Sequence, residues 1–260
     1  MVGLVELRER VRRIERPASA QHGVVPFGIA AIDRALPGGG LMRGALHEIV
    51  GSGGDEEDGA LAAAFAAGIV GRLAATADGI VPWCLKRPDL YGLGLAAQGL
   101  DPGRLVLVRA AHDTEILWAM EEGLRAGGVT AAVVGEIAAL PMVASRRLQL
   151  AAERSGVTAF IVRRWRDAAQ VARERSRPSA AATRWRIAAM PSAPTGGEPG
   201  IGHPRWRVEL MRCRGGEPAC WEAEVADATG SLSVAAELAD RPPPPRRGDR
   251  FPPEKFRRAG

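Results

Sequence analysis

The sequence predicts an α/β protein with a mostly parallel sheet flanked by helices and a C-terminal antiparallel hairpin. Between Phe27 and about Arg164, short runs that are apolar throughout alternate with runs of helical periodicity. A strand that is apolar on both faces needs cover on both, and helices supply that cover in parallel sheets. Beyond Arg164, two strand-like runs are joined by a glycine-containing turn, which is typical of a hairpin.

The elements can be placed in chain order. Strands are predicted at Leu46–Val50, Gly79–Leu85, Arg104–Arg109, Thr130–Val134 and Thr158–Val162, with helices near 59–75, 114–126 and 141–155 between them. Asp113 or Thr114 is placed to cap the second of these helices, and Pro141 to open the third. Gly156 stands where a helix commonly ends in the left-handed conformation. "RWRIAAM" predicts a further strand, and "RWRVELMRCR" with "WEAEV" predicts the hairpin.

The two ends of the chain differ from this core. Leu4, Leu7, Val11 and Ile14 form the apolar stripe of an amphipathic helix predicted for residues 1–16. The stripe packs either on the chain's own domain or on another protein, in which case these four residues bind a partner. Residues 17–26 are predicted to be a linker and residues 27–240 the folded domain. The basic, proline-rich residues 241–260 are predicted to be a disordered tail.

The composition favours a cytoplasmic protein that can bind polyanions. The 260 residues carry a formal net charge of +5, with a pI near 9.8, and nearly all of the positive charge is arginine. Three cysteines without CxxC spacing and four scattered histidines argue against a disulfide framework or a metal site. No run approaches the ~20 apolar residues of a membrane span, and the first residues lack the order of a signal peptide.

A glycine-rich turn after the first predicted strand resembles a phosphate-binding loop that has lost its lysine. Such a loop, G-x-x-x-x-G-K-[ST], offers backbone N–H groups and a lysine to phosphates and a hydroxyl to Mg²⁺. The degenerate loop comprises Gly51, Gly54, Asp55, Asp58, Gly59 and Ala60. Gly54 and Gly59 keep the glycine spacing, but Ala60 stands at the lysine position. Asp55 or Asp58 is expected to cap the next helix in place of a phosphate, and an unrelated acidic surface turn is the alternative.

Several segments, taken in order, resemble a known family. "FGIAAIDRALPGGGLMRGALHEIVG" resembles the opening of the RecA-like recombinase core, and "VTAAVVGEIAAL" and "VTAFIVRRWRD" follow in the order of that core's strands. "PWCLKRPDLYGLGLAAQGLDPGRLVLVRA", "ATRWRIAAMPSAP" and "PRWRVELMRCRGGEPACWEAEV" are similar to ImuA-type proteins, the RecA-like accessory factors of bacterial damage-induced mutagenesis. The resemblance covers roughly residues 27–240.

This resemblance implies a RecA-like fold in a DNA-damage-inducible complex. The family's partners are an inactive Y-family-type polymerase homologue and an error-prone replicative-type polymerase. The resemblance also implies contacts with RecA. In that setting the protein would support translesion synthesis during the SOS response.

The resemblance also indicates where a RecA-type ATPase carries its chemistry. Besides the lysine, such an enzyme needs an aspartate at the end of an apolar strand to hold Mg²⁺, and a glutamate after another strand to activate water. Here "AAVV" ends in Gly135, and Glu136 comes one residue late and therefore faces the opposite side. "VPWCLKRPD" offers no acid before Asp89. We therefore expect no catalytic residue, no cofactor, no metal and no hydrolysis.

An arginine-rich segment follows the last parallel strand, where RecA-like filaments carry a mobile loop that touches DNA. The candidate DNA-binding residues are Arg163, Arg164, Trp165, Arg166, Arg173, Arg175 and Arg177. Arginines neutralise phosphates and a tryptophan can stack on a base, which suits single-stranded DNA. A docking face for an acidic partner and a solvated amphipathic helix remain open alternatives.

Together these features predict a non-catalytic RecA-like accessory factor that bridges polymerase partners, RecA and DNA in error-prone translesion synthesis. One alternative is a DNA-dependent ATPase of the recombinase-mediator kind, which the missing lysine opposes. Another is a cell-division inhibitor of the SulA type. Such a chain would not need the arginine-rich residues 163–186.

Overall fold

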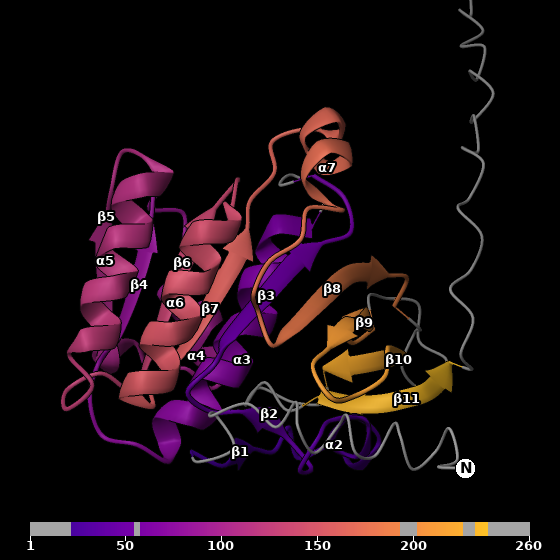
Figure 1. Ribbon diagram of the computed structural model, residues 1–260. Coiled ribbons are helices and arrows are strands. Elements are labelled where there is room, and N and C mark those ends of the chain that lie inside the picture. The colour runs from indigo at the N-terminus through magenta and orange to yellow at the C-terminus, as the bar shows by residue number, and fades with distance from the viewer. Residues whose placement is uncertain (1–21, 55–57, 193–201, 226–231, 239–260) are drawn as a thin grey trace, which may run out of the picture.

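The computed structural model describes residues 22–54, 58–192, 202–225 and 232–238. The predicted helix of residues 1–16 and the predicted tail of residues 241–260 lie outside these ranges. Within them, the chain forms one large sheet with helices on both faces (Figure 1).

The large sheet holds nine strands in the described part of the chain. Its parallel strands are β3 (Leu46–Gly51), β4 (Val81–Leu85), β5 (Leu105–Arg109), β6 (Ala132–Ile137), β7 (Thr158–Arg163) and β8 (Thr183–Met190). The sheet continues with the antiparallel strands β9 (Arg205–Cys213), β10 (Ala219–Val225) and β11 (Leu232–Leu238). The strand order is β11-β10-β9-β8-β3-β7-β6-β4-β5, which places β3 near the middle.

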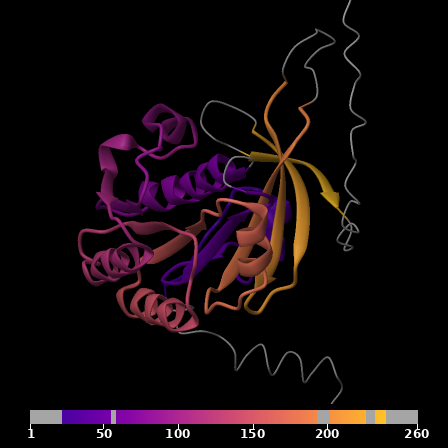
Figure 2. The same cartoon turned by 90° about the horizontal axis from the view of Figure 1, so that it is seen from above.

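Helices cover both faces of the parallel strands (Figures 1 and 2). The face with α3 (Ala60–Ala75) and α4 (Gly92–Ala97) is opposite the face with α5 (Asp113–Arg125) and α6 (Met142–Ser155). The shorter elements are α2 (Ala30–Ala35), the 3₁₀ turn η3 (Pro102–Arg104) and α7 (Ala168–Glu174). Small residues let α3 lie close to its neighbours: a Cβ on Gly71 would stand 2.3 Å from the carbonyl oxygen of Gly99.

Aromatic packing joins the parallel and antiparallel parts of the sheet. Trp185 of β8 is fully buried, and its ring centroid lies 5.6 Å from that of Phe65 on α3. It also lies 5.2 Å from Phe27 and 6.2 Å from Trp221 on β10. Aromatic pairs at these separations add to the burial energy. The C-terminal hairpin therefore shares one hydrophobic core with the N-terminal half of the chain.

The predicted fold class and its principal elements are confirmed, although several ends differ. Gly156 ends α6 with φ 78°, as expected. Pro141 is the N-cap residue of α6 and so stands just before its first turn. The predicted cap of α5 is wrong, because its N-cap is His112, which makes no side-chain capping bond. Asp113 instead accepts hydrogen bonds from the N–H groups of Ala138 and Ala139, each at 3.2 Å, and so ties α5 to the end of β6.

Some elements were not expected from the sequence. Strand β1 (Val24–Val25) pairs with β2 (Leu41–Met42), so the end of the predicted linker 17–26 belongs to the fold. Helix α2 and strand β11 were not predicted either. Strand β5 is the edge of the sheet, and Val106 and Leu107 are exposed there. Cover on both faces was therefore the wrong expectation for this strand.

Candidate functional site at the carboxyl edge of the sheet

The loop between β3 and α3 encloses a carboxylate of its own. Asp58 is only 7% exposed, and its Oδ2 accepts the N–H of Gly53 at 2.7 Å. Its Oδ1 accepts the N–H of Ala189, at the end of β8, at 3.3 Å. A Cβ on Gly51 would stand 2.8 Å from the Cβ of Asp58, so the chain is closely packed at this point. The loop thus offers a backbone N–H to an anion, and that anion is the side chain of Asp58.

The side-chain cap expected for α3 from Asp58 is not formed. The N-cap residue of α3 is Gly59, which has no side-chain capping bond, and Asp58 reaches back to the loop instead. Asp55, the other candidate for a cap, lies outside the described residues. Ala60 is the first residue of α3 and is exposed, with no charge to offer a phosphate. Gly54 lies against the backbone of Trp165 and Arg166, whose carbonyl oxygens are each 3.7 Å from an ideal Cβ position on it.

Two adjacent strands end in a charged cluster where an ATPase would hold Mg²⁺. Glu136 of β6 is buried, and its Oε1 accepts the indole N–H of Trp83 on β4 at 2.8 Å. Its Oε2 lies 2.7 Å from Nη1 of Arg164, whose Nη2 lies 2.8 Å from Oδ2 of Asp89. Burial raises the pKa of Glu136 above its ordinary value, although Arg164 and Trp83 act in the opposite direction.

Gly135 stands where an ATPase would carry the aspartate that holds Mg²⁺, and a side chain at this position would clash with its neighbours. A Cβ on Gly135 would stand 2.2 Å from the sulfur of Met120 on α5. Gly135 and Glu136 face opposite sides of β6, as their alternation predicts. A carboxylate at residue 135 would therefore require the Met120 side chain to shift.

The predicted DNA-binding segment is only partly accessible. Arg163 is 2% exposed and is held between Glu48 of β3, at 3.1 Å, and Glu174 of α7, at 3.0 Å. Arg184 also pairs with Glu48, at 2.8 Å. Burial lowers the pKa of Arg163, whereas the two carboxylates raise it. This side chain joins β3, β7 and α7 and is not open to a phosphate.

Two neighbours of Arg163 are also inaccessible, contrary to the sequence-based expectation. Trp165 is 2% exposed, and its indole N–H donates to the carbonyl of Ala138 at 3.0 Å. Its ring cannot stack on a base in this arrangement. Arg164 is largely buried and is paired with Glu136 and Asp89.

The other four predicted residues, Arg166, Arg173, Arg175 and Arg177, are exposed on α7 and its flanks. Arg173 and Arg177 lie 3.5 and 3.0 Å from Oε1 of the buried Glu174, and both side chains remain more than half exposed. Asp167 caps α7 by accepting the N–H of Gln170 at 2.8 Å. These arginines therefore form an accessible basic surface beside the degenerate loop.

The sequence reading missed the carboxylates that neutralise the arginines. Glu48 was the detectable one, because it is an acid inside an otherwise apolar strand, "LHEIV". Its partner Arg163 is 115 residues away along the chain, so no local pattern could join them. Within the described residues, no group of three or more His, Cys, Asp or Glu side chains could hold a metal ion. None of the helices described here is long and apolar enough to cross a bilayer.

The fold and this edge define an α/β protein with a phosphate-type loop that lacks its lysine and encloses an aspartate. No family model matches the chain. The chain is 41% identical over 225 residues to Protein ImuA of Caulobacter vibrioides strain NA1000 / CB15N, and the same holds for strain ATCC 19089 / CIP 103742 / CB 15. Each alignment covers 84% of this chain and 91% of the relative. The chain belongs to the ImuA family.

Proposed function

We propose that this protein is a non-catalytic, RecA-like accessory factor of damage-inducible mutagenesis. Its role is to support error-prone translesion synthesis in the SOS response by bridging proteins and DNA. Membership of the ImuA family supports the setting. Its partners in this proposal are an inactive Y-family-type polymerase homologue, an error-prone replicative-type polymerase, RecA and single-stranded DNA.

The observation that carries the non-catalytic role is the Asp58 carboxylate inside the loop. It takes up the N–H of Gly53, which a phosphate oxygen would need. Like charges about 4 Å apart repel by about 4 kcal/mol at an effective dielectric near 20, so a triphosphate is disfavoured beside this carboxylate. Ala60 offers no compensating charge at the lysine position, and Gly135 has no space for a metal ligand.

The exposed arginines of α7 support direct contact with DNA. Arg166, Arg173, Arg175 and Arg177 lie on one accessible segment beside the loop. Phosphate contacts of this kind weaken with salt, with a slope of log K against log[salt] of about −0.7 per contact for single strands. The contact is electrostatic, because the buried Trp165 is not available for stacking.

A paired titration tests the proposal. One arm follows fluorescent ATP with Mg²⁺, and the other follows labelled single-stranded DNA over a series of salt concentrations. We expect no nucleotide binding and salt-dependent DNA binding. The double variant Arg166→Ala/Arg173→Ala should make the salt slope shallower by about 1.4. The matched control is Arg109→Ala/Arg146→Ala, which removes two exposed arginines from other surfaces and should leave the slope unchanged.

Two results would contradict the proposal. Micromolar ATP binding with turnover would favour the mediator-type ATPase and overturn the interpretation of the loop. DNA binding that is insensitive to salt, or equally reduced in both double variants, would exclude the α7 surface as the DNA contact. Recovery of the tubulin-like division protein instead of polymerase partners from cell extract would favour the SulA-type alternative.

A further inference from the structure

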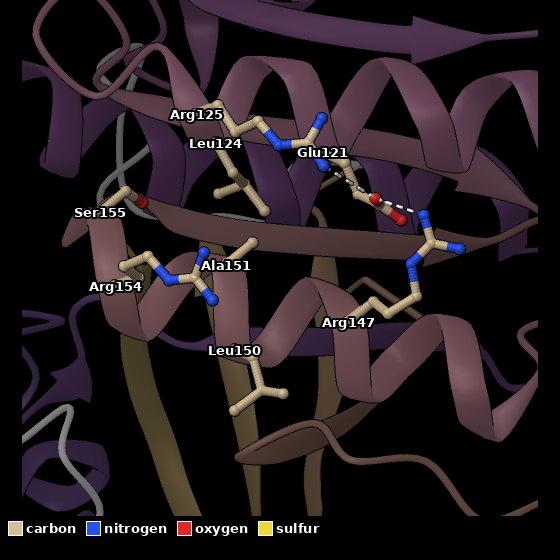
Figure 3. Close-up of a pocket in the computed structure, with 8 residues that line it drawn as sticks. All are labelled: Glu121, Leu124, Arg125, Arg147, Leu150, Ala151, Arg154 and Ser155. Carbon is tan, nitrogen blue, oxygen red and sulfur yellow. Dashed lines mark hydrogen bonds and ion pairs between the residues drawn. The ribbon is translucent and has the colours of Figure 1, made fainter.

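A pocket with a volume of about 420 Å³ lies between α5 and α6 (Figure 3). Its lining residues are Glu121, Leu124, Arg125, Arg147, Leu150, Ala151, Arg154 and Ser155. They come from the C-terminal half of α5 and from the middle and C-terminal part of α6. Both helices run antiparallel to the parallel strands (Figure 1). Their C-terminal ends, which line much of this pocket, are therefore at the opposite end of the sheet from the loop between β3 and α3 that contains Asp58.

The pocket has more positive charge than its own carboxylate neutralises. Glu121 is buried at the pocket wall and pairs with Arg147 at 2.5 Å and with Arg125 at 3.6 Å. Figure 3 shows both arginines directed at this one carboxylate, with Arg154 apart from it. In the described part of the chain, Arg154 makes no ion pair or hydrogen bond. Among these residues Arg154 is therefore unpaired, and Arg147 pairs with the buried Glu121 alone. Arg125 pairs with Glu121 and also with the exposed Glu122.

Exposed apolar side chains accompany these charges on α6. Val143 is 71% exposed and Leu150 is 58% exposed, one heptad apart on the same side of the helix. Arg147, Leu150 and Arg154 occupy positions i, i+3 and i+7, so they lie on one face of the helix with Leu150 between the two arginines. The one acidic residue of α6 is Glu153, and it is half-buried. The face therefore offers a cation, an apolar side chain and a second cation in sequence.

We propose that this surface, made of Arg125, Arg147, Leu150 and Arg154, docks an acidic segment of a partner protein that carries an aliphatic side chain between its carboxylates. The partner's carboxylates pair with the guanidinium groups of Arg154 and Arg147. Such pairs are strongest when both oxygens of a carboxylate accept hydrogen bonds from one guanidinium. The aliphatic side chain covers Leu150 and enters the apolar part of the pocket beside Leu124.

The two ends of the chain do not have the charge that this surface would bind. Residues 1–21 hold five basic and three acidic residues, and residues 239–260 hold seven basic and three acidic residues. Both would bring further positive charge to the arginines. A nucleic acid would satisfy the guanidinium groups, but its phosphates would leave Leu150 and Val143 uncovered. An acidic, apolar protein segment fits both features.

Fluorescence anisotropy with designed probes tests the proposal on the full chain. The main probe is a labelled amphipathic peptide with leucines flanked by glutamates on one face. Two further peptides carry Leu→Ser or Glu→Lys throughout, and a labelled single-stranded oligonucleotide is the fourth probe. Arg154→Glu and Leu150→Glu are the surface variants. Arg146→Glu is the matched control, because this exposed arginine of α6 does not line the pocket.

The expected result is saturable binding of the glutamate–leucine peptide that weakens about tenfold or more in Arg154→Glu and in Leu150→Glu, but less than about twofold in Arg146→Glu. The Leu→Ser and Glu→Lys peptides should bind at least about tenfold more weakly than the main peptide. Circular dichroism confirms that each variant is folded.

Four results would overturn the proposal. The first is that the main peptide does not bind at concentrations up to about 1 mM, and the second is that the Leu→Ser peptide binds as tightly as the main peptide. The third is that all three protein variants lose the same affinity for the main peptide. The fourth is that the oligonucleotide binds and that its binding is lost in Arg154→Glu and Leu150→Glu but not in Arg146→Glu. Self-association of the protein that is abolished in Leu150→Glu would assign the surface to a second copy of the chain. These outcomes are independent of the ATP and DNA titrations, because the two sites are at opposite ends of the fold.

Discussion

Replacing Asp58 by alanine tests whether its carboxylate acts as the anion of the loop. The substitution removes the acceptor of the Gly53 N–H at 2.7 Å and of the Ala189 N–H at 3.3 Å. A buried donor left without a partner costs about 1–3 kcal/mol, and a hydrogen bond to a charged group contributes about 1.5–3 kcal/mol. Because Gly53 is itself partly exposed, water can replace part of the loss. We therefore expect the free energy of unfolding to fall by about 2 kcal/mol in urea.

The stronger part of this prediction is rescue by an added anion. If the loop N–H groups form an anion site that Asp58 fills, inorganic phosphate should bind the Asp58→Ala variant and not the wild-type protein. At ten times its dissociation constant, phosphate would restore about 1.4 kcal/mol. The assay is urea unfolding at constant ionic strength, with phosphate exchanged for chloride, so that general salt effects cancel between samples.

Asp101→Ala is the matched control for this experiment. Asp101 also accepts the N–H of a glycine, Gly103 at 2.8 Å, but it does so in an exposed turn. It should lose less than about 1 kcal/mol and should show no specific response to phosphate. The reasoning is refuted if Asp58→Ala is as stable as the wild type, or if phosphate stabilises wild type, Asp58→Ala and Asp101→Ala equally.

Three further predictions concern buried charges and close packing. Arg163→Met leaves two buried glutamates without their shared partner and should cost about 3 kcal/mol in urea unfolding. Arg177→Ala removes a half-exposed arginine from Glu174, which keeps Arg163 and Arg173 as partners, and should cost less than about 1 kcal/mol. Equal losses would contradict this reasoning. Gly135→Ala places a Cβ against Met120 and should cost about 1–3 kcal/mol in thermal unfolding, and a neutral result would show that α5 yields easily. Burial lowers the pKa of His47 from 6.5 to about 4, so its contribution to stability is complete above pH 6.5 and is lost as the pH falls toward 4, by up to about 3 kcal/mol. His47→Gln should flatten that part of the stability curve, and an unchanged curve would show that other groups control it.

The fold could be predicted because its signals are local. Strand β4 is apolar and buried throughout, and β7 is mostly apolar. Helices such as α6 carry a clear period and a glycine at the end. The exceptions lack such signals. Strands β1 and β2 have two residues each and exist through their pairing with each other. The carboxylate of Asp113 could have capped α5 on local grounds, but it lies beside the N–H groups of Ala138 and Ala139, which no local rule reveals.

The candidate site could be located from the sequence, but its contacts could not. The glycine spacing and the missing lysine identified the loop that contains Asp58. What the sequence could not show is that this carboxylate turns back to Gly53 and bridges to Ala189, which lies 131 residues further along the chain. Composition also gave no means of separating buried from exposed arginines, since both kinds stand side by side in residues 163–177.

The two kinds of arginine in this segment have complementary roles. The buried Arg163 joins β3 to α7 through Glu48 and Glu174, and such pairs are weak sources of net stability because both charges lose water. Their benefit is positional, because removal of either partner leaves an uncompensated charge, and this holds α7 in one place beside the loop. The exposed Arg166 and Arg173 are thereby presented on a fixed surface. Loss of DNA binding on mutation of Arg163 would therefore not identify a phosphate contact, whereas loss on mutation of Arg173 would.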